Sequence, residues 1–297
     1  MQHIKKAPII FLLTLMLQTA FGLGKAPEYI VYQNIGKCTN VISGKVVVLK
    51  KGDFLSSASI VNIPTGGKLI LLCANYKALQ INTKGKYTIK SLSQQCINGN
   101  GSFTAKYFRF VWDEFTHPHS SPEAKPEKYM KTAGAVTRGN NPINSAVELD
   151  TINYFNGLLA IKFRPEKETV TVSFATRAKS QSFLFSQKST GFLSFKQFVA
   201  TKPKFGIYYW QISTSNYKKG PIQVLNLMDE QEYKKKIKAI IATVTLIEDK
   251  AEEAFMTAFL LEQNKYLAEA QQYYRTAVAL NPKNKTYQAF SARFYNE

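Results

Sequence analysis

Residues 44–92 show the most regular pattern of hydrophobic and polar positions in the chain: short apolar runs separated by glycine, aspartate and proline turns. The alternation predicts strands at Val46–Leu49, Leu69–Cys73 and Leu79–Ile81, because successive side chains of a strand point to opposite faces. A leading strand is expected at 28–33. The turns recur about every ten residues, which is typical of a compact all-β module.

The same stretch contains an ordered series of short motifs. They read G-K-V-x-V, K-G-D-x-L, x-V-x-I-P-x-G-G-x-L-x-L and x-G-x-Y-x-I. This order resembles the FecR-like periplasmic β domain. The resemblance implies an extracytoplasmic β module that makes contacts and carries out no chemistry. Regulators of that family use a membrane helix and a cytoplasmic segment to relay the occupancy of a siderophore receptor to a sigma factor, and we expect neither segment here.

An aromatic stretch at 102–115 follows the β module. Phe103, Tyr107, Phe110, Val111 and Phe115 recur at helical spacing, which predicts an amphipathic helix that closes a domain spanning residues 23–116. Two alternatives remain open. Either the helix is clamped inside the molecule between two domains, or its aromatic side docks a partner.

Residues 117–142 are rich in proline, serine and charged residues without apolar periodicity, which predicts a linker. His117 and His119, close to Asp113 and Glu114, are the only candidate metal ligands in this region. The proline between the two histidines and the lack of a third histidine after the leader favour the linker. We therefore predict no metal site.

The β pattern resumes at 143–228. Its arrangement resembles an immunoglobulin-like β-sandwich of about seven strands. Within it, Trp210 is interpreted as a core residue rather than a surface for stacking a ligand. The expected strands are Leu158–Phe163, Thr169–Ala175, Ser182–Phe185, Phe192–Phe198, Ile207–Ser213 and Ile222–Leu227.

Residues 229–297 are predicted to be helical. Asp229 followed by Glu232 forms a capping-box-like start. The hairpin at 251–282 then resembles a tetratricopeptide repeat, a class of module that binds peptides or assembles complexes. The residues in its consensus positions are Ala258, Leu261, Leu267, Ala270, Tyr274, Ala277 and Pro282. A single repeat cannot bury its own face, so we expect either flanking helices that include 286–295 or another protein to cover it.

The fold class predicted from these patterns is multidomain β plus α. A small all-β domain comes first, an immunoglobulin-like sandwich is central, and a helical bundle of tetratricopeptide type ends the chain.

The N-terminal residues predict the cellular compartment of the protein. Lys5 and Lys6 precede an apolar run at 8–17, and small residues at Ala20 and Gly22 flank a cleavage position. This is the pattern of a signal peptide over residues 1–22, and no cysteine follows that would indicate a lipoprotein. We expect an exported protein, periplasmic or associated with the envelope, with no transmembrane segment in the mature chain.

The chain has three cysteines, Cys38, Cys73 and Cys96. An oxidising compartment permits a disulfide. One alternative is a Cys38–Cys96 bridge across the two ends of the β module, with Cys73 as a buried core thiol. The other is three reduced cysteines.

The net charge of +19 comes mostly from lysine. A basic surface could attract a polyanion, but the scarcity of arginine argues against nucleic acid. The sequence shows no catalytic constellation, and we predict no catalytic residues, no cofactor and no enzyme. The leading hypothesis is a non-enzymatic adaptor or scaffold that contacts proteins of the cell envelope. The alternatives are a binder of an anionic envelope polymer and a FecR-type signalling accessory.

Overall fold

The computed structural model describes residues 28–42, 44–97, 102–116, 147–156, 159, 161–162, 169–178, 182–214, 219–244 and 249–295. Two compact units emerge from the contacts of the chain, residues 1–75 with 81–98 and residues 76–80 with 99–297. The expected signal peptide at 1–22 and linker at 117–142 lie outside the described residues.

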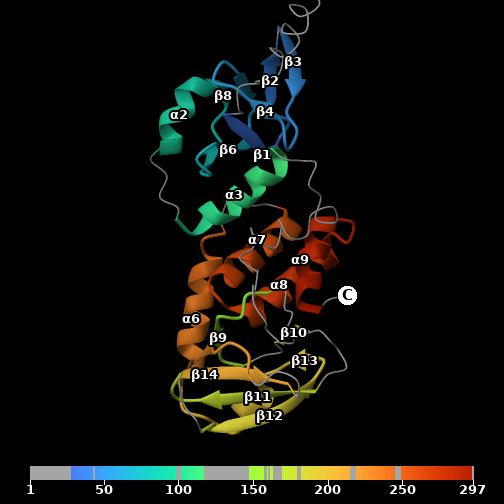
Figure 1. Ribbon diagram of the computed structural model, residues 1–297. Coiled ribbons are helices and arrows are strands. Elements are labelled where there is room, and N and C mark those ends of the chain that lie inside the picture. The colour runs from blue at the N-terminus through green and yellow to red at the C-terminus, as the bar shows by residue number, and fades with distance from the viewer. Residues whose placement is uncertain are drawn as a thin grey trace, which may run out of the picture. The chain divides into compact units, whose positions relative to one another are not determined.

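Two four-stranded sheets make up most of the described residues before 98 (Figure 1). One sheet has the order β4-β1-β6-β7 and contains β1 (Tyr29–Ile35), β4 (Phe54–Leu55), β6 (Lys68–Cys73) and β7 (Ala78–Ile81). The other has the order β3-β2-β5-β8 and contains β2 (Thr39–Ile42), β3 (Lys45–Val48), β5 (Ile60–Ile63) and β8 (Gly85–Thr88). The strand pairs β1–β4, β1–β6, β2–β3, β2–β5 and β5–β8 are antiparallel, so the β pattern of this region is confirmed.

The first unit also contains a helix that the sequence analysis did not predict. Helix α2 (Ile89–Ile97) begins where β8 ends, so the expectation of an all-β module is wrong at this point. Ile89 and Leu92 lie three residues apart and are both buried, as expected for residues on one face of a helix.

A disulfide joins Cys73 at the end of β6 to Cys96 in α2. The Asn75 side chain adds a hydrogen bond to the Cys96 carbonyl at 3.1 Å. The expected Cys38–Cys96 bridge is therefore wrong, and so is the expectation of three reduced cysteines. Cys38 is the free, buried thiol instead, because α2 folds back to β6 and brings the Cα atoms of Cys73 and Cys96 to 6.3 Å.

One close approach in the first unit requires glycine. Gly36 has φ +76°, and a Cβ atom there would lie 2.8 Å from the Gly67 Cα atom. Gly67 ends a turn in which its N–H donates to the Pro64 carbonyl at 2.9 Å. The glycines of the Pro64–Gly67 motif thus let two turns pack backbone to backbone.

The second unit contains a five-stranded sheet with the order β12-β11-β14-β15-β9 and a two-stranded sheet β10-β13. Their bounds are β9 (Thr151–Tyr154), β10 (Ile161–Lys162), β11 (Thr169–Ala175), β12 (Phe185–Thr190), β13 (Phe192–Leu193), β14 (Gly206–Ser213) and β15 (Gln223–Leu227). The pair β15–β9 is parallel. Strand β9 was not predicted from the sequence, although its residues Thr151 to Tyr154 alternate between polar and apolar.

Aromatic side chains fill the buried face of the five-stranded sheet. Phe174 stacks on Phe198 with ring centroids 4.2 Å apart, and Phe195 packs edge-on against Trp210 at 5.3 Å. The strand expected at Phe192–Phe198 is wrong in its second half, because Lys196–Ala200 forms helix α5. The helical turn places Phe195 and Phe198, three residues apart, on the same side.

Four helices end the chain, namely α6 (Glu230–Ile241), α7 (Lys250–Gln263), α8 (Leu267–Leu280) and α9 (Lys285–Tyr295). The predicted capping residue Asp229 accepts hydrogen bonds from the N–H groups of Gln231 and Glu232. Asp249 caps α7 in the same way. The C-terminal helical region is thus confirmed.

Helix α3 (Ser102–Thr116) packs on these C-terminal helices. Phe110 contacts Phe255 and Phe259 of α7 and Phe290 of α9 at centroid distances of 5.3 to 6.1 Å. Ten of the fourteen residues of α7 are buried, and in Figure 1 α7 lies among the other helices. Helices of the same chain therefore cover the α7–α8 hairpin, for which the sequence analysis expected either flanking helices or another protein.

Candidate functional site

Strand β3 presents the most exposed run of apolar residues described in the first unit. Val46, Val47 and Val48 are 69%, 45% and 46% exposed, and Lys45 is exposed as well. Among the described strands, β3 is an edge of its sheet and has β2 as its only neighbour. An edge strand offers unpaired backbone groups, so β3 offers both hydrogen-bonding groups and apolar side chains.

The neighbouring strands extend this apolar area. Val46 lies opposite Val41 of β2, and Val41 lies opposite Ile60 of β5. Residues directly opposite one another share a face of the sheet, and Ile60 is 41% exposed. We define the β3 surface as the open edge of β3 together with Val41, Val46, Val48 and Ile60.

On the other face of the same sheet, Val47 of β3 is 45% exposed, whereas the residues beside it on β2 and β5 are buried. Val47 lies opposite Asn40, and Asn40 lies opposite Val61. Asn40 is 3% exposed and Val61 is fully buried. The β3 surface is therefore the solvent side of a sheet whose opposite side is buried at β2 and β5.

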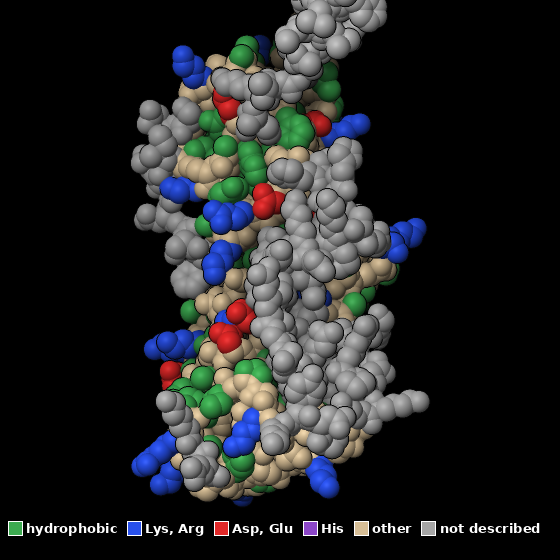
Figure 2. Space-filling view, viewed as in Figure 1, with side chains coloured by type: hydrophobic (Ala, Val, Ile, Leu, Met, Phe, Trp, Pro, Cys, Tyr) green, Lys and Arg blue, Asp and Glu red, His purple; other side chains and the backbone are tan. Residues whose placement is uncertain are grey.

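The surroundings of the β3 surface are basic. Residues 28–97 contain nine lysines, no arginine and only two acidic residues, Glu28 and Asp53. Lys45 begins β3, Lys50 follows it closely, and both are exposed. Figure 2 shows hydrophobic side chains and lysines exposed together on the first unit.

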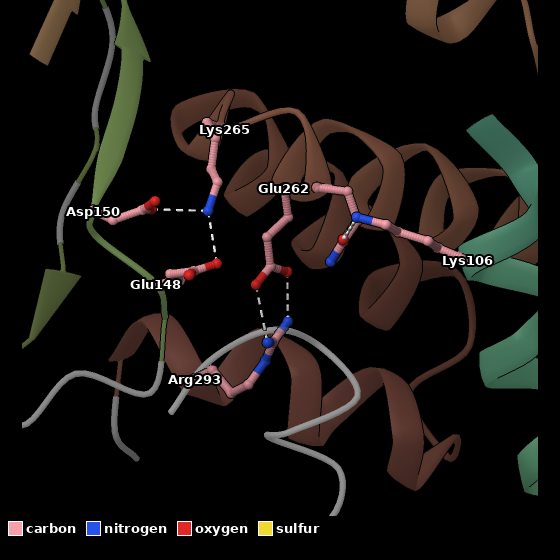
Figure 3. Close-up of polar contacts among 7 residues, drawn as sticks. Lys106, Glu148, Asp150, Glu262, Lys265 and Arg293 are labelled. Carbon is pink, nitrogen blue, oxygen red and sulfur yellow. Dashed lines mark hydrogen bonds and ion pairs between the residues drawn. The ribbon is translucent and has the colours of Figure 1, made fainter. Parts of the chain in front are cut away.

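The second unit contains a buried charged cluster, shown in Figure 3. Arg293 of α9 forms an ion pair with Glu262 of α7 at 2.6 Å, and both side chains are less than 10% exposed. The Tyr274 hydroxyl of α8 donates to Glu262 at 2.7 Å, and burial, followed by the charge of Glu262, raises the pKa of Tyr274 well above its usual value. Because these groups satisfy one another across three helices, the cluster is structural.

A second polar cluster fastens the loop between α7 and α8 to the sheet. The Lys265 ammonium donates to Glu148 at 2.6 Å and to Asp150 at 2.8 Å (Figure 3). Burial alone lowers the pKa of Lys265, but these two carboxylates outweigh it and the pKa is raised. The Asn153 N–H donates to the Lys265 carbonyl at 2.8 Å. These contacts fix the hairpin on β9.

A third cluster joins a carboxylate to tyrosines. The Tyr233 hydroxyl of α6 donates to Glu269 of α8. Burial raises the pKa of Glu269, and burial with the Glu269 charge raises the pKa of Tyr154 to about 12. Tyr154, Tyr233 and Tyr266 are all at most 6% exposed. The tyrosines of the cluster are thus buried, whereas Glu269 is half-buried.

The candidate residues from the sequence do not form a reactive site among the described residues. Asp113 and Glu114 lie half-buried on α3, and His117 and His119 lie outside the described residues. Across the part of the chain that the structure describes, no group of three metal-ligating side chains occurs. Trp210 is 1% exposed, so its predicted role in the core is confirmed.

Sequence reasoning placed the valines of β3 in a strand but did not identify them as a surface. The available signal was Val46-Val47-Val48 itself, since a half-buried strand alternates apolar with polar residues and this one does not. Arg293 and Glu262 were missed altogether, because residues 31 positions apart in sequence give no local pattern.

Comparisons with known proteins add no assignment to this geometry. No protein-family model matches the chain, and no curated protein matches it. Among the described residues, no helix is both long and apolar enough to cross a membrane.

Proposed function

We propose that this protein is a non-enzymatic adaptor of the cell envelope that binds a partner protein through the β3 surface. The observation that carries the proposal is the exposure of Val46, Val48 and Ile60 at 69%, 46% and 41%. Exposed apolar residues that gather next to an open sheet edge are unusual in isolated proteins and typical of interaction sites.

The helical region supports the choice of the first unit as the contact site. A tetratricopeptide-like hairpin binds partners along an open helical face, but Phe255 and Phe259 of α7 are 2% and 1% exposed. Tyr107 and Phe110 of α3 occupy that position. In this proposal the helices serve as a closed scaffold.

The finer fold assignments belong to the same proposal. The first unit is FecR-like, the five-stranded sheet belongs to an immunoglobulin-like domain, and α7 with α8 forms a tetratricopeptide-like hairpin. The antiparallel strands around Trp210 support the second assignment. The small residues Ala258, Ala270 and Ala277, all fully buried, support the third because they let helices approach closely.

Export is proposed from the leader at residues 1–22. The Cys73–Cys96 disulfide is compatible with an oxidising export compartment. A partner would then be a protein of the periplasm or envelope.

A site-specific photocrosslinker tests the adaptor function. We expect p-benzoylphenylalanine in place of Val46 to give a discrete protein adduct in cells of the source organism. The matched control is the same group in place of Thr88, which is exposed on the opposite edge strand β8. Adducts of equal yield at both positions, or none at either, would contradict the proposal.

One observation favours a second candidate, binding of an anionic envelope polymer. The nine lysines and two acidic residues of 28–97 give the first unit a strong positive charge. Binding of this kind would weaken steeply with added salt, since the exposed charges are screened. Titration of the protein with dextran sulfate at low and physiological salt separates it from apolar contact through the β3 surface.

A further inference from the structure

We propose that the partner segment is an extended strand with acidic flanks that adds to the open edge of β3. This inference rests on the proposed adaptor function and specifies the chemistry of its partner. Addition of a strand to a sheet edge gives affinity through main-chain hydrogen bonds and specificity through alternate side chains.

The hydrogen bonds of the β2–β3 hairpin identify the free backbone groups. The Leu49 N–H donates to the Cys38 carbonyl at 3.0 Å, so Leu49 faces β2. In an antiparallel pair, the residues that bond to the neighbour alternate with residues that face away from it. Val47 and Lys45 therefore bond to β2, whereas Val46 and Val48 turn their N–H and C=O groups to the open edge.

The side chains beside that edge set the chemistry of an entering strand on one face. Val46, Val41 and Ile60 form one row across the sheet, and Val48 begins the next. An added strand would place every second side chain beside Val46 or Val48. Apolar residues at those positions would remove the exposed valines from water, which is favourable in proportion to the area covered.

The exposed lysines at the two ends of β3 favour a partner segment that carries acidic residues. Lys45 lies at one end of β3 and Lys50 just beyond the other, and both are exposed. Carboxylates that flank the apolar positions would lie next to these ammonium groups. A second copy of the chain would instead bring nine lysines and two acidic residues in its own 28–97 region, and like charges at an edge oppose pairing.

The probe is a fluorescein-labelled peptide, Glu-Glu-Val-Thr-Val-Thr-Val-Glu, titrated into the full mature chain and followed by anisotropy. Two further peptides carry N-methyl groups either on the valines or on the threonines. Because alternate N–H groups of an added strand face β3, we expect one methylated peptide to bind at least about tenfold more weakly and the other to bind nearly as the parent does. A peptide with lysine in place of every glutamate is expected to bind at least about tenfold more weakly.

Variants of the protein provide the reciprocal test. Val48→Pro removes an outward N–H without removing a bond to β2, and proline is tolerated on edge strands. The matched control is Thr88→Pro. The Ile89 N–H donates to the Ser59 carbonyl, so the Thr88 N–H faces away from β5 at the opposite edge. We expect weaker peptide binding only for Val48→Pro.

The outcomes separate this inference from the adaptor function. Three outcomes would each overturn strand addition by an acidic segment. The first is an equal loss of binding for the two methylated peptides, and the second is equal binding of the lysine peptide and the acidic peptide. The third is a salt-stable dimer of the chain that Val48→Pro dissociates. If the crosslinker at Val46 still captures a partner protein after any of these outcomes, the proposed adaptor function is retained and only the proposed mode of partner binding is wrong. If the acidic peptide binds and the methylated and lysine peptides bind as expected, but the crosslinker captures no protein, strand addition to β3 is supported. The proposed adaptor function is then wrong.

Discussion

The guanidinium of Arg293 donates two hydrogen bonds to the carboxylate of Glu262, from Nη1 to Oε1 at 2.9 Å and from Nη2 to Oε2 at 2.6 Å. The pair joins α9 to α7, and Tyr274 of α8 donates to the same carboxylate. The Arg293 guanidinium also lies 4.2 Å from the centroid of the Phe290 ring. One buried arginine thus connects α7, α8 and α9.

Loss of this ion pair should be costly. We expect Arg293→Met to lower the free energy of unfolding by about 3–5 kcal/mol, because Glu262 would be left buried without its partner. Replacing both residues by methionine should recover much of the loss. Urea unfolding measures these differences.

The control is the exposed pair Lys234–Glu230, whose side chains are 65% and 54% exposed. Lys234→Met should cost less than about 0.5 kcal/mol, since water screens such a pair. Similar losses for Arg293→Met and Lys234→Met would show that the buried pair has no special role.

The cysteines give a second prediction. Opening the Cys73–Cys96 bridge, for example with Cys96→Ser, should destabilise the protein by about 3 kcal/mol, because the bridge closes a loop of intermediate length. Thermal or urea unfolding of the variant against the parent checks this.

Cys38→Ser serves as the matched control, because it should leave the bridge intact. Alkylation followed by mass spectrometry should label one thiol, and only after unfolding, since Cys38 is buried and burial raises its pKa. Labelling of Cys73 or Cys96 in the unreduced protein would refute the pairing.

Glu269 gives a pH dependence. Burial raises the pKa of Glu269 above its ordinary value of 4.5. Between the ordinary and the raised value, the folded protein holds a proton that the unfolded chain has lost, so the free energy of unfolding falls as pH rises through this window. Glu269→Gln removes the titrating group and should flatten the profile just above the ordinary value of 4.5. A variant with the same slope as the parent would contradict this.

The docking of α3 is the fourth prediction. Phe110→Ala should lower the stability of the second unit by about 3–5 kcal/mol, as for other buried phenylalanines, because Phe110 is 4% exposed among three rings of α7 and α9. Hydrogen exchange should show lower protection of the α7 amides. Phe115→Ala, on the half-buried end of the same helix, should have a clearly smaller effect.

The elements with a strong local period were predicted well. β11 matches its expected bounds at Thr169–Ala175, since its side chains alternate over seven residues. Asp229 was found as a helix cap because Asp followed three residues later by Glu is a local signal, and its side chain accepts hydrogen bonds from the N–H groups of Gln231 and Glu232. Helix α5 was missed because five residues are too few for a helical period to show, and strand β9 was missed although its four residues alternate between polar and apolar.

The candidate site was predicted only in part, for a related reason. A run of valines determines a strand, but its position at the edge of a sheet depends on which other strands pair with it. β3 pairs with β2, and no described strand occupies its other side. The exposure of Val46 therefore depends on the order of the strands in the sheet, and this order cannot be predicted from the residues of β3 alone.

By itself, the sequence determined the local conformations: the strands of 44–88, the helices after 229 and their caps, all of which depend on side chains a few positions apart. Only the tertiary structure decided that Cys96 pairs with Cys73 rather than Cys38, that α3 covers α7, and that Arg293 meets Glu262. Each of these depends on contacts between segments distant along the chain. Local periodicity carries no information about such distances, because they are set by how whole elements pack.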